Sequence, residues 1–396
     1  MCLSSSVFAD HDDDRDEPRT VVYVESNKTE DNSILAFHRD EKGELILVGE
    51  FLTGGRGVFD PSLALGPVEL DQNIITNAEH TLLFAANSGS DTIAVFRIRG
   101  DGSLKHVGGS PFPSGGVNPV SVGLSRDTLV VVNKAIDPAR PELNQPNYVT
   151  FRVATDGALV AGPISTISAP SGSSPTQAAL SPGKRLAFDA QFLGGMLQSF
   201  LIEPTGVLTP TDIQALPASE FVGSNQPPFP LGLWSHPRHP ILYVGFPTIN
   251  RLGVYTFNSV GRLTFKRGVP NAGEAICWLR NNEEGTRLYT TNTADNTVSV
   301  YDTTQPLNPV EIQTLKLNGV GNPVQLELDP QGNFLYVVTQ RGFDTIPLGQ
   351  GSTLHAIKVD KVTGRLAQTG LSPVELPVPA ATRPQGVVAT QVRGAQ

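Results

Sequence analysis

The sequence predicts an all-β fold, a seven-bladed β-propeller built from four-stranded antiparallel blades. The first reason is a sequence pattern that recurs seven times: a β-rich run ending in a polar residue, a small turn, and a second β-rich run. The apolar residues that mark the first runs are Val22, Leu83, Leu129, Leu186, Leu242, Leu288 and Leu335. Successive markers are 61, 46, 57, 56, 46 and 47 residues apart. Such a period, with two to four strands per unit, is typical of propeller blades.

The composition is the second reason. The 396 residues include 39 Gly and 32 Pro, and only 17% are charged. Many short strands joined by turns suit this balance, whereas long helices do not. Because the repeat runs along most of the chain, we expect one closed array over residues 20–392 instead of several domains.

Each unit is expected to hold four strands in order. The inner strand follows an Asn-Pro start, as at Asn118-Pro119 and Asn322-Pro323. The marker run is the second strand, and a run such as 297–301 is the third. Asp-Gly turns then lead to short outer strands that begin at Leu104 and Leu159.

The two ends of the chain predict how the ring closes. Residues 21–24 already resemble a second strand, so the first blade lacks its own inner strand. Residues 383–390 resemble an inner strand with no blade after it. Pairing the two would remove two exposed sheet edges, so the C-terminal strand should complete the N-terminal blade.

The N-terminal segment, residues 1–19, is expected to be a disordered arm or the remnant of an export signal. Val7-Phe8-Ala9 is similar to the small-residue end of a secretory signal, and an acidic run follows it. The signal interpretation predicts a secreted or periplasmic protein. An ordinary flexible N-terminus is the alternative.

Charge and hydropathy exclude some partners. The net charge of −9 and the lack of a Lys/Arg cluster disfavour nucleic acid. No stretch approaches the roughly 18 apolar residues that cross a bilayer, so we expect no membrane insertion. Cys277 lies in an apolar run and should be a small buried hydrophobe. Trp278 and Tyr289 should pack between blades.

Strand direction assigns two faces to the ring. We call the face where inner strands begin the top, and the Asp-Gly turns then fall on the bottom. The longer irregular segments go to the top: residues 51–71, 134–147, 163–177, 210–230 and 341–351. Long loops on one mouth of a rigid scaffold are the usual arrangement of a ligand site, although they could also only cap the ring.

Several segments resemble the seven-bladed lactonase-type propellers over residues 20–392. They are Asp71-Gln72-Asn73, the run 83–90, Ala275-Ile276-Cys277-Trp278 and the run 287–293. That family includes 6-phosphogluconolactonase, 3-carboxy-cis,cis-muconate cyclase and exported bacterial members of unknown activity. The resemblance implies a site at the top of the channel, with His, Glu and Arg around a carboxylated or phosphorylated lactone. Here the residues that start the fourth inner strand, 173–177, contain no His, so a His-based mechanism does not transfer.

Charged residues near the top are the candidates for chemistry. Glu274 precedes an inner strand and would act as a general base if burial raised its pKa; a solvated or ion-paired Glu is the alternative. Lys134, Arg341 and Arg383 would hold a substrate carboxylate or phosphate. Surface or inter-blade salt bridges explain the same three residues equally well.

Amide side chains complete the predicted site. Gln177, Asn292 and Gln325 are the predicted substrate-binding amides. For an Asn that ends a second strand the alternative role is structural, since Asn caps turns with its side chain. No Cys/His spacing indicates a metal, and we expect no cofactor, although Asn and backbone oxygens would suit a structural cation in the channel.

These observations lead to two functional hypotheses. The first is lactone hydrolysis or the related cyclisation, acting on a small anionic ligand at the top of the central channel. The second is a non-catalytic extracytoplasmic propeller that recognises a glycan, a peptide or a protein partner on the same face. A scaffold without a pocket would follow if the long loops plug the mouth.

Overall fold

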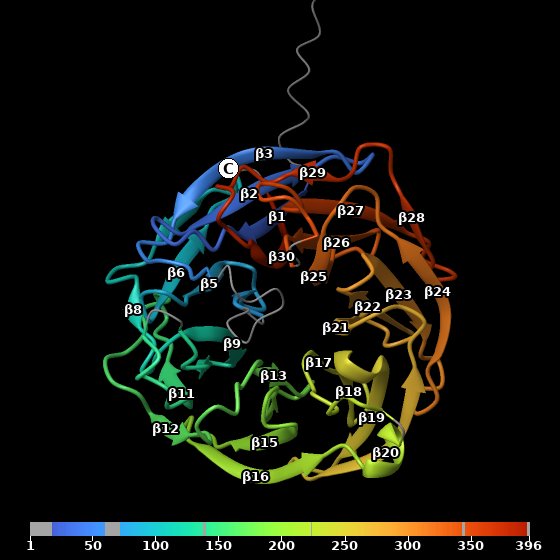
Figure 1. Cartoon of the computed structure of the whole chain (residues 1–396). Coiled ribbons are helices and arrows are strands. Elements are labelled where there is room, and N and C mark those ends of the chain that lie inside the picture. Colours follow the sequence, from blue (N-terminus) through green and yellow to red (C-terminus); the bar gives the residue numbers. More distant parts are fainter. Residues whose placement is uncertain (1–17, 60–71, 138–139, 223, 343–344, 394–396) are drawn as a thin grey trace, which may run out of the picture.

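Seven antiparallel sheets form a ring around a central channel (Figure 1). The computed structural model describes residues 18–59, 72–137, 140–222, 224–342 and 345–393. Within these ranges every element is a β-strand except two short 3-10 helices, η2 (Ala218–Phe221) and η3 (Pro247–Ile249). The predicted fold class is therefore confirmed.

The first four blades contain the following strands, given from the channel outwards. Blade one has β30 (Gln385–Val392), β1 (Arg19–Glu25), β2 (Ser33–Arg39) and β3 (Leu45–Leu52). Blade two has β4 (Ile74–Thr76), β5 (Leu82–Asn87), β6 (Thr92–Ile98) and β7 (Leu104–His106). Blade three has β9 (Pro119–Ser125), β10 (Thr128–Asn133), β11 (Asn147–Arg152) and β12 (Ser165–Ser168). Blade four has β13 (Ala179–Leu180), β14 (Leu186–Gln191), β15 (Met196–Ile202) and β16 (Leu208–Ala215).

The last three blades repeat the same order. Blade five has β17 (Leu233–Ser235), β18 (Ile241–Phe246), β19 (Arg251–Phe257) and β20 (Leu263–Pro270). Blade six has β21 (Ile276–Asn281), β22 (Arg287–Asn292), β23 (Thr297–Asp302) and β24 (Val310–Lys316). Blade seven has β25 (Asn322–Leu328), β26 (Phe334–Gln340), β27 (Thr353–Val359) and β28 (Leu366–Gln368). A fifth strand extends two sheets: β8 (Phe112–Pro113) pairs with β6, and β29 (Val374–Glu375) pairs with β27.

The ring closes as the ends of the sequence predict. Strand β30 pairs antiparallel with β1 from Arg19 opposite Val392 to Glu25 opposite Gln385. The last strand thus supplies the inner strand of blade one, and neither strand is left with a free edge on this side.

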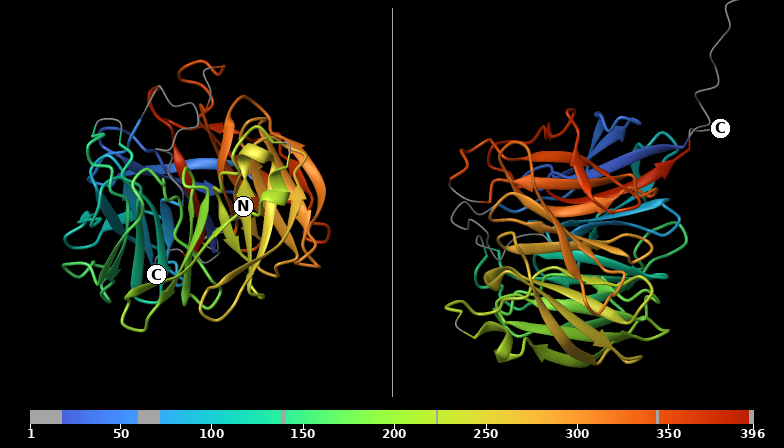
Figure 2. Two further views of the ribbon diagram at one scale, coloured as in Figure 1. Left: turned by 60° about the horizontal axis from the view of Figure 1, so that its bottom comes forward. Right: turned by 90° about the vertical axis from the view of Figure 1, so that its right-hand side faces the viewer.

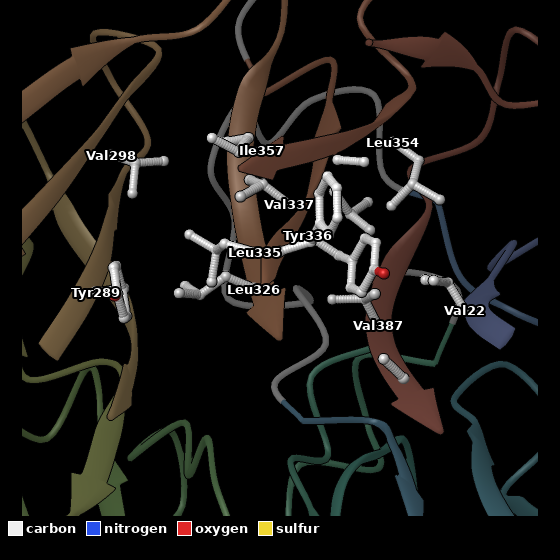
Figure 3. Packing of buried hydrophobic residues seen from close by; sticks show 14 of the residues in the cluster. Val22, Tyr289, Val298, Leu326, Leu335, Tyr336, Val337, Leu354, Ile357 and Val387 are labelled. Carbon is white, nitrogen blue, oxygen red and sulfur yellow. The ribbon is translucent and has the colours of Figure 1, made fainter. Parts of the chain in front are cut away.

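The seven marker residues form the heart of the packing between blades. Each lies on a second strand, and six of the seven are fully buried, Leu186 being 4% exposed. Figure 3 shows part of this packing, with Leu335 of blade seven between Tyr289 of blade six on one side and Val22 of blade one on the other. Because side chains alternate between the two faces of a strand, the second strand of each blade places one set of its side chains in a blade interface.

Two expectations about outer strands are wrong. The outer strand of blade three is β12, while Leu159 makes only an isolated bridge to Val153. Residues 208–215 form β16, so this part of the predicted top loop at 210–230 is an outer strand. In blade three the outermost strand begins further along the chain than its turn signal indicates, and in blade four it extends further than expected, because few packing contacts specify these strands.

The ring's two faces are set by strand direction, and Figure 2 shows the strands running across its thickness. Inner strands begin at the top and end at the bottom. Most of the predicted N-terminal arm, residues 1–17, lies outside the described residues. Within the described ranges, no helix has the length and apolar character to cross a membrane.

Candidate functional site

The central channel contains a cavity of about 420 Å³ that the inner strands of all seven blades line. Two of the predicted amides, Gln177 and Gln325, lie in its wall together with Gln72. Gln177 donates from Nε2 to Oε1 of Gln72 at 2.8 Å and accepts the backbone N–H of Leu233 at 2.7 Å. This side chain therefore links blades two, four and five at the upper part of the channel.

Trp278 also lines this cavity, although the sequence predicts that it packs between blades. It is 5% exposed, and in the described part of the chain no acceptor pairs with its indole Nε1. Tyr289, in contrast, is buried between blades six and seven and donates to the carbonyl of Gly364 at 3.1 Å. A buried indole N–H without an acceptor costs free energy, which a ligand oxygen in the channel would offset.

Glu274 lies where the sequence places it, two residues before β21, but its side chain is exposed. Its backbone carbonyl accepts a hydrogen bond from the N–H of Ala294 at 3.0 Å. A general base at neutral pH needs burial or a like charge to raise its pKa. The structure does not supply burial at this position.

The three predicted cations occupy different surroundings at the top. Lys134 is buried, and its charge opposes the rise that burial causes in the pKa of Asp189. Arg341 is half-buried and donates from Nε to the carbonyl of Ile346 at 2.6 Å. Arg383 is buried with its guanidinium carbon 5.5 Å from the ring centroid of Phe59. Among described residues, none of the three belongs to the wall of the channel cavity.

Asn292 is held inside blade six. Its Oδ1 accepts from Asn271 at 2.8 Å, and its Nδ2 donates to Thr297 at 2.9 Å and Ser299 at 2.8 Å. The preceding loop passes so close that a Cβ on Gly273 would lie 2.1 Å from this amide. The structural role of an Asn at the end of a second strand therefore explains this residue, as it does Asn87, whose neighbour is Gly55.

Two carboxylates are fully buried near the top. Glu25 accepts from Asn32 at 2.6 Å and Asn73 at 2.5 Å, and burial raises its pKa to about 8 despite these hydrogen bonds. Asp189 accepts the phenol of Tyr148 at 2.7 Å, and burial raises its pKa to about 6. Their positions, at the ends or middle of second strands, make them parts of blade interfaces.

One ring of equivalent positions stands out lower in the channel. In every blade, the inner-strand residue that pairs with the residue after the marker lines the cavity. From blade one to blade seven these residues are Val388, Ile75, Gly123, Leu180, Trp234, Arg280 and Glu327. The first four blades contribute apolar side chains or glycine, and the last three contribute an aromatic ring, a cation and a carboxylate.

These last three side chains form a continuous contact on one side of the channel. The Arg280 guanidinium carbon lies 4.1 Å from the centroid of the Trp234 ring, a cation–π geometry. Its Nη2 lies 2.5 Å from Oε1 of Glu327. Burial raises the pKa of Glu327, and the Arg280 charge opposes that rise. The carboxylate is only 9% exposed, so this ion pair works in a less polar medium than a surface pair.

A groove on the bottom face continues from this ring. It has a volume of about 640 Å³ and runs between blades six and seven. Trp234, Arg280, Glu327 and His80 line both the groove and the channel cavity. The His80 ring, whose Nδ1 is 3.3 Å from the Thr76 hydroxyl, has a pKa lowered by burial. The bottom groove and the channel cavity therefore meet at the ion pair.

Metal ligation finds no support in side-chain clusters. Across the described ranges, no group of three His, Cys, Asp or Glu side chains lies close enough to hold an ion. Cys277 is a buried thiol, in agreement with its predicted role as a small hydrophobe.

Sequence reasoning missed Trp234, Arg280 and Glu327 as site residues. A signal existed, because pairing each inner strand against its marker run places these three at one level. Irregular register between Ile276 and Leu279, and between Pro323 and Leu326, obscures that signal when residues are counted from the start of the inner strand.

Solved structures of other propellers share this fold. A "putative 6-phosphogluconolactonase" from Bacteroides uniformis is 14% identical, with 94% of this chain and 99% of that chain covered and a TM-score of 0.71. The periplasmic gluconolactonase of Pseudomonas aeruginosa is 16% identical over 95% of this chain and 99% of its own, with a TM-score of 0.67. A hypothetical selenium-binding protein from Sulfolobus tokodaii is 12% identical over 96% of both chains, with a TM-score of 0.64. No family model and no curated protein sequence matches the chain. The resemblance to lactonase-type propellers is thus confirmed for the fold.

Proposed function

We propose that this protein binds a small, hydroxylated, anionic molecule in its central channel and hydrolyses a lactone of that class, or closes one in reverse. The observation that carries the proposal is the wall of the 420 Å³ cavity. Amides at its upper part, the indole N–H of Trp278 and the cation Arg280 supply donors to hydroxyl, carbonyl and carboxylate oxygens.

The size of the cavity supports a small ligand. Small-molecule sites usually have volumes of about 300–1,000 Å³, mostly apolar walls and a few placed polar groups. The channel has this character, since Ile74, Val387 and Leu326 separate its polar residues. The "putative 6-phosphogluconolactonase" and the gluconolactonase that share this fold favour a sugar lactone over other small anions.

The three predicted cations at the top of the ring would assist ligand binding without lining the cavity. Lys134, Arg341 and Arg383 would attract an anionic ligand from the top, and a secreted or periplasmic location would suit such a binding protein. Cell fractionation of the full chain, expressed with its own N-terminus, tests the location. Retention in the cytoplasm would contradict it.

A lactone panel tests the function. Neutral, carboxylated and phosphorylated sugar lactones are assayed for acid release, and binding of the matching sugar acids is measured by calorimetry. Replacing Gln325 by leucine should weaken binding about tenfold, because one hydrogen bond inside the channel is worth about 1.5 kcal/mol. Gln305→Leu, at an exposed position of blade six, is the matched control.

The panel also separates the two functional hypotheses. Hydrolysis that fails with every lactone, together with binding of a sugar acid, would leave a non-catalytic binding propeller. Failure of both would contradict the proposed function and favour a glycan, peptide or protein partner.

A further inference from the structure

Trp234, Arg280 and Glu327 stand at equivalent inner-strand positions where the other four blades have apolar residues or glycine. An isolated ion pair in a blade wall adds little stability, since replacing such pairs by apolar residues is often neutral or stabilising. Four blades of this ring do without polar side chains, so the fold itself does not require Arg280 and Glu327. The pair therefore calls for a chemical explanation.

The position of Glu327 suits proton transfer. It lies two residues after Gln325 on β25 and lines the same cavity, one strand repeat of about 6.6 Å further down. It also lines the groove on the bottom face. Burial raises its pKa, which makes this carboxylate a stronger base than an exposed one.

The position of Arg280 suits charge stabilisation. Its guanidinium is held from two sides, by the Trp234 ring and by Oε1 of Glu327. A planar group with several donors that is fixed before the reaction lowers the cost of forming a nearby oxyanion.

We infer that Glu327 is the general base of lactone hydrolysis and that Arg280 stabilises the oxyanion, with Trp234 as a positioning residue. This inference rests on the proposed function. Water attacks the lactone carbonyl carbon while the Glu327 carboxylate takes one of its protons, and the carbonyl electrons move to the oxygen beside Arg280. When the oxyanion collapses, the acyl–oxygen bond of the ring breaks, and the leaving oxygen receives the proton from Glu327. The product is a hydroxy acid, and Glu327 returns to its carboxylate form.

The first test compares three glutamine substitutions. Glu327→Gln should lower kcat about 10²- to 10⁴-fold while calorimetric affinity for the product sugar acid changes only a few-fold. Glu41→Gln is the matched control, because Glu41 is exposed on a bottom turn of blade one and lines neither the cavity nor the groove. Glu274→Gln tests the carboxylate predicted from sequence. Loss of hydrolysis in Glu274→Gln together with full activity in Glu327→Gln would overturn the inference.

The second test uses the pH dependence and holds even if Glu327→Gln does not fold. The wild-type rate should rise with pH as Glu327 loses its proton, and Arg280→Gln should move this limb to higher pH because the opposing cation is gone. A purely structural ion pair would leave the limb in place, and that result would overturn the inference. If the wild type hydrolyses no lactone, the proposed function fails as well; if it does and Glu327→Gln is equally active, only this inference fails.

Discussion

Replacing Gly386 by alanine should weaken the seam at which the propeller closes. Gly386 is the second residue of β30 and has a φ of +78°, which an L-residue adopts at a cost of about 1–2 kcal/mol. A Cβ there would lie 2.3 Å from Oδ1 of Asn73 and 2.5 Å from Cγ2 of Ile74. Both atoms belong to blade two, so the clash separates blades one and two.

The magnitude follows from what Asn73 does. Its amide donates to Glu25, and displacing it leaves a fully buried acceptor short of a donor, a loss of about 1–3 kcal/mol. With the backbone term, the free energy of unfolding should fall by about 2–5 kcal/mol. Urea unfolding followed by tryptophan fluorescence measures this, because both tryptophans, Trp234 and Trp278, line the channel.

Two other glycines separate the contributions. Gly195→Ala has a φ of +66° and no heavy atom within 4 Å of the new Cβ, so it should cost only the backbone term of about 1–2 kcal/mol. Gly108→Ala has open space and no positive φ and should be close to neutral. A Gly386→Ala variant no less stable than Gly195→Ala would refute the argument that the seam depends on this contact.

Three further predictions concern buried polar groups. Because the Glu25 pKa rises from 4.5 to about 8 on folding, the folded chain binds more protons than the unfolded chain between these pH values. The free energy of unfolding should therefore fall as pH rises through this window, by up to about 1.4 kcal/mol per pH unit. In urea titrations, Glu25→Gln should flatten this slope between about pH 6.5 and 8. Asn292→Ala should cost about 2–4 kcal/mol of unfolding free energy, since Asn271 loses its acceptor; unchanged stability with weaker ligand binding would instead make Asn292 a ligand contact. Arg39→Leu should cost about 3–5 kcal/mol, because it removes the cation 3.0 Å from the buried Asp329 of blade seven, and adding Asp329→Asn should restore part of this loss in the same assay.

The repeat could be predicted from the sequence because its cause is local. Strands, turns and markers recur with period-two alternation, and every blade buries its marker in the same way. The ring closure was equally accessible, since an unmatched second strand and an unmatched inner strand are both visible at the ends of the chain. The structural role of the Asn residues that end second strands also follows from turn chemistry alone.

The site required tertiary structure, because burial of a charge depends on neighbours from other blades. Nothing local distinguishes the exposed Glu274 from the buried Glu327; Arg280, 47 residues earlier in the chain, provides the cation that accompanies the second of these carboxylates. Register irregularities in β21 and β25 further decide which side chains face the channel. The number of blades, their strand order and the seam follow from the sequence alone. Which carboxylate lies beside a cation at the cavity follows only from the assembled ring, because that pair is a contact between blades.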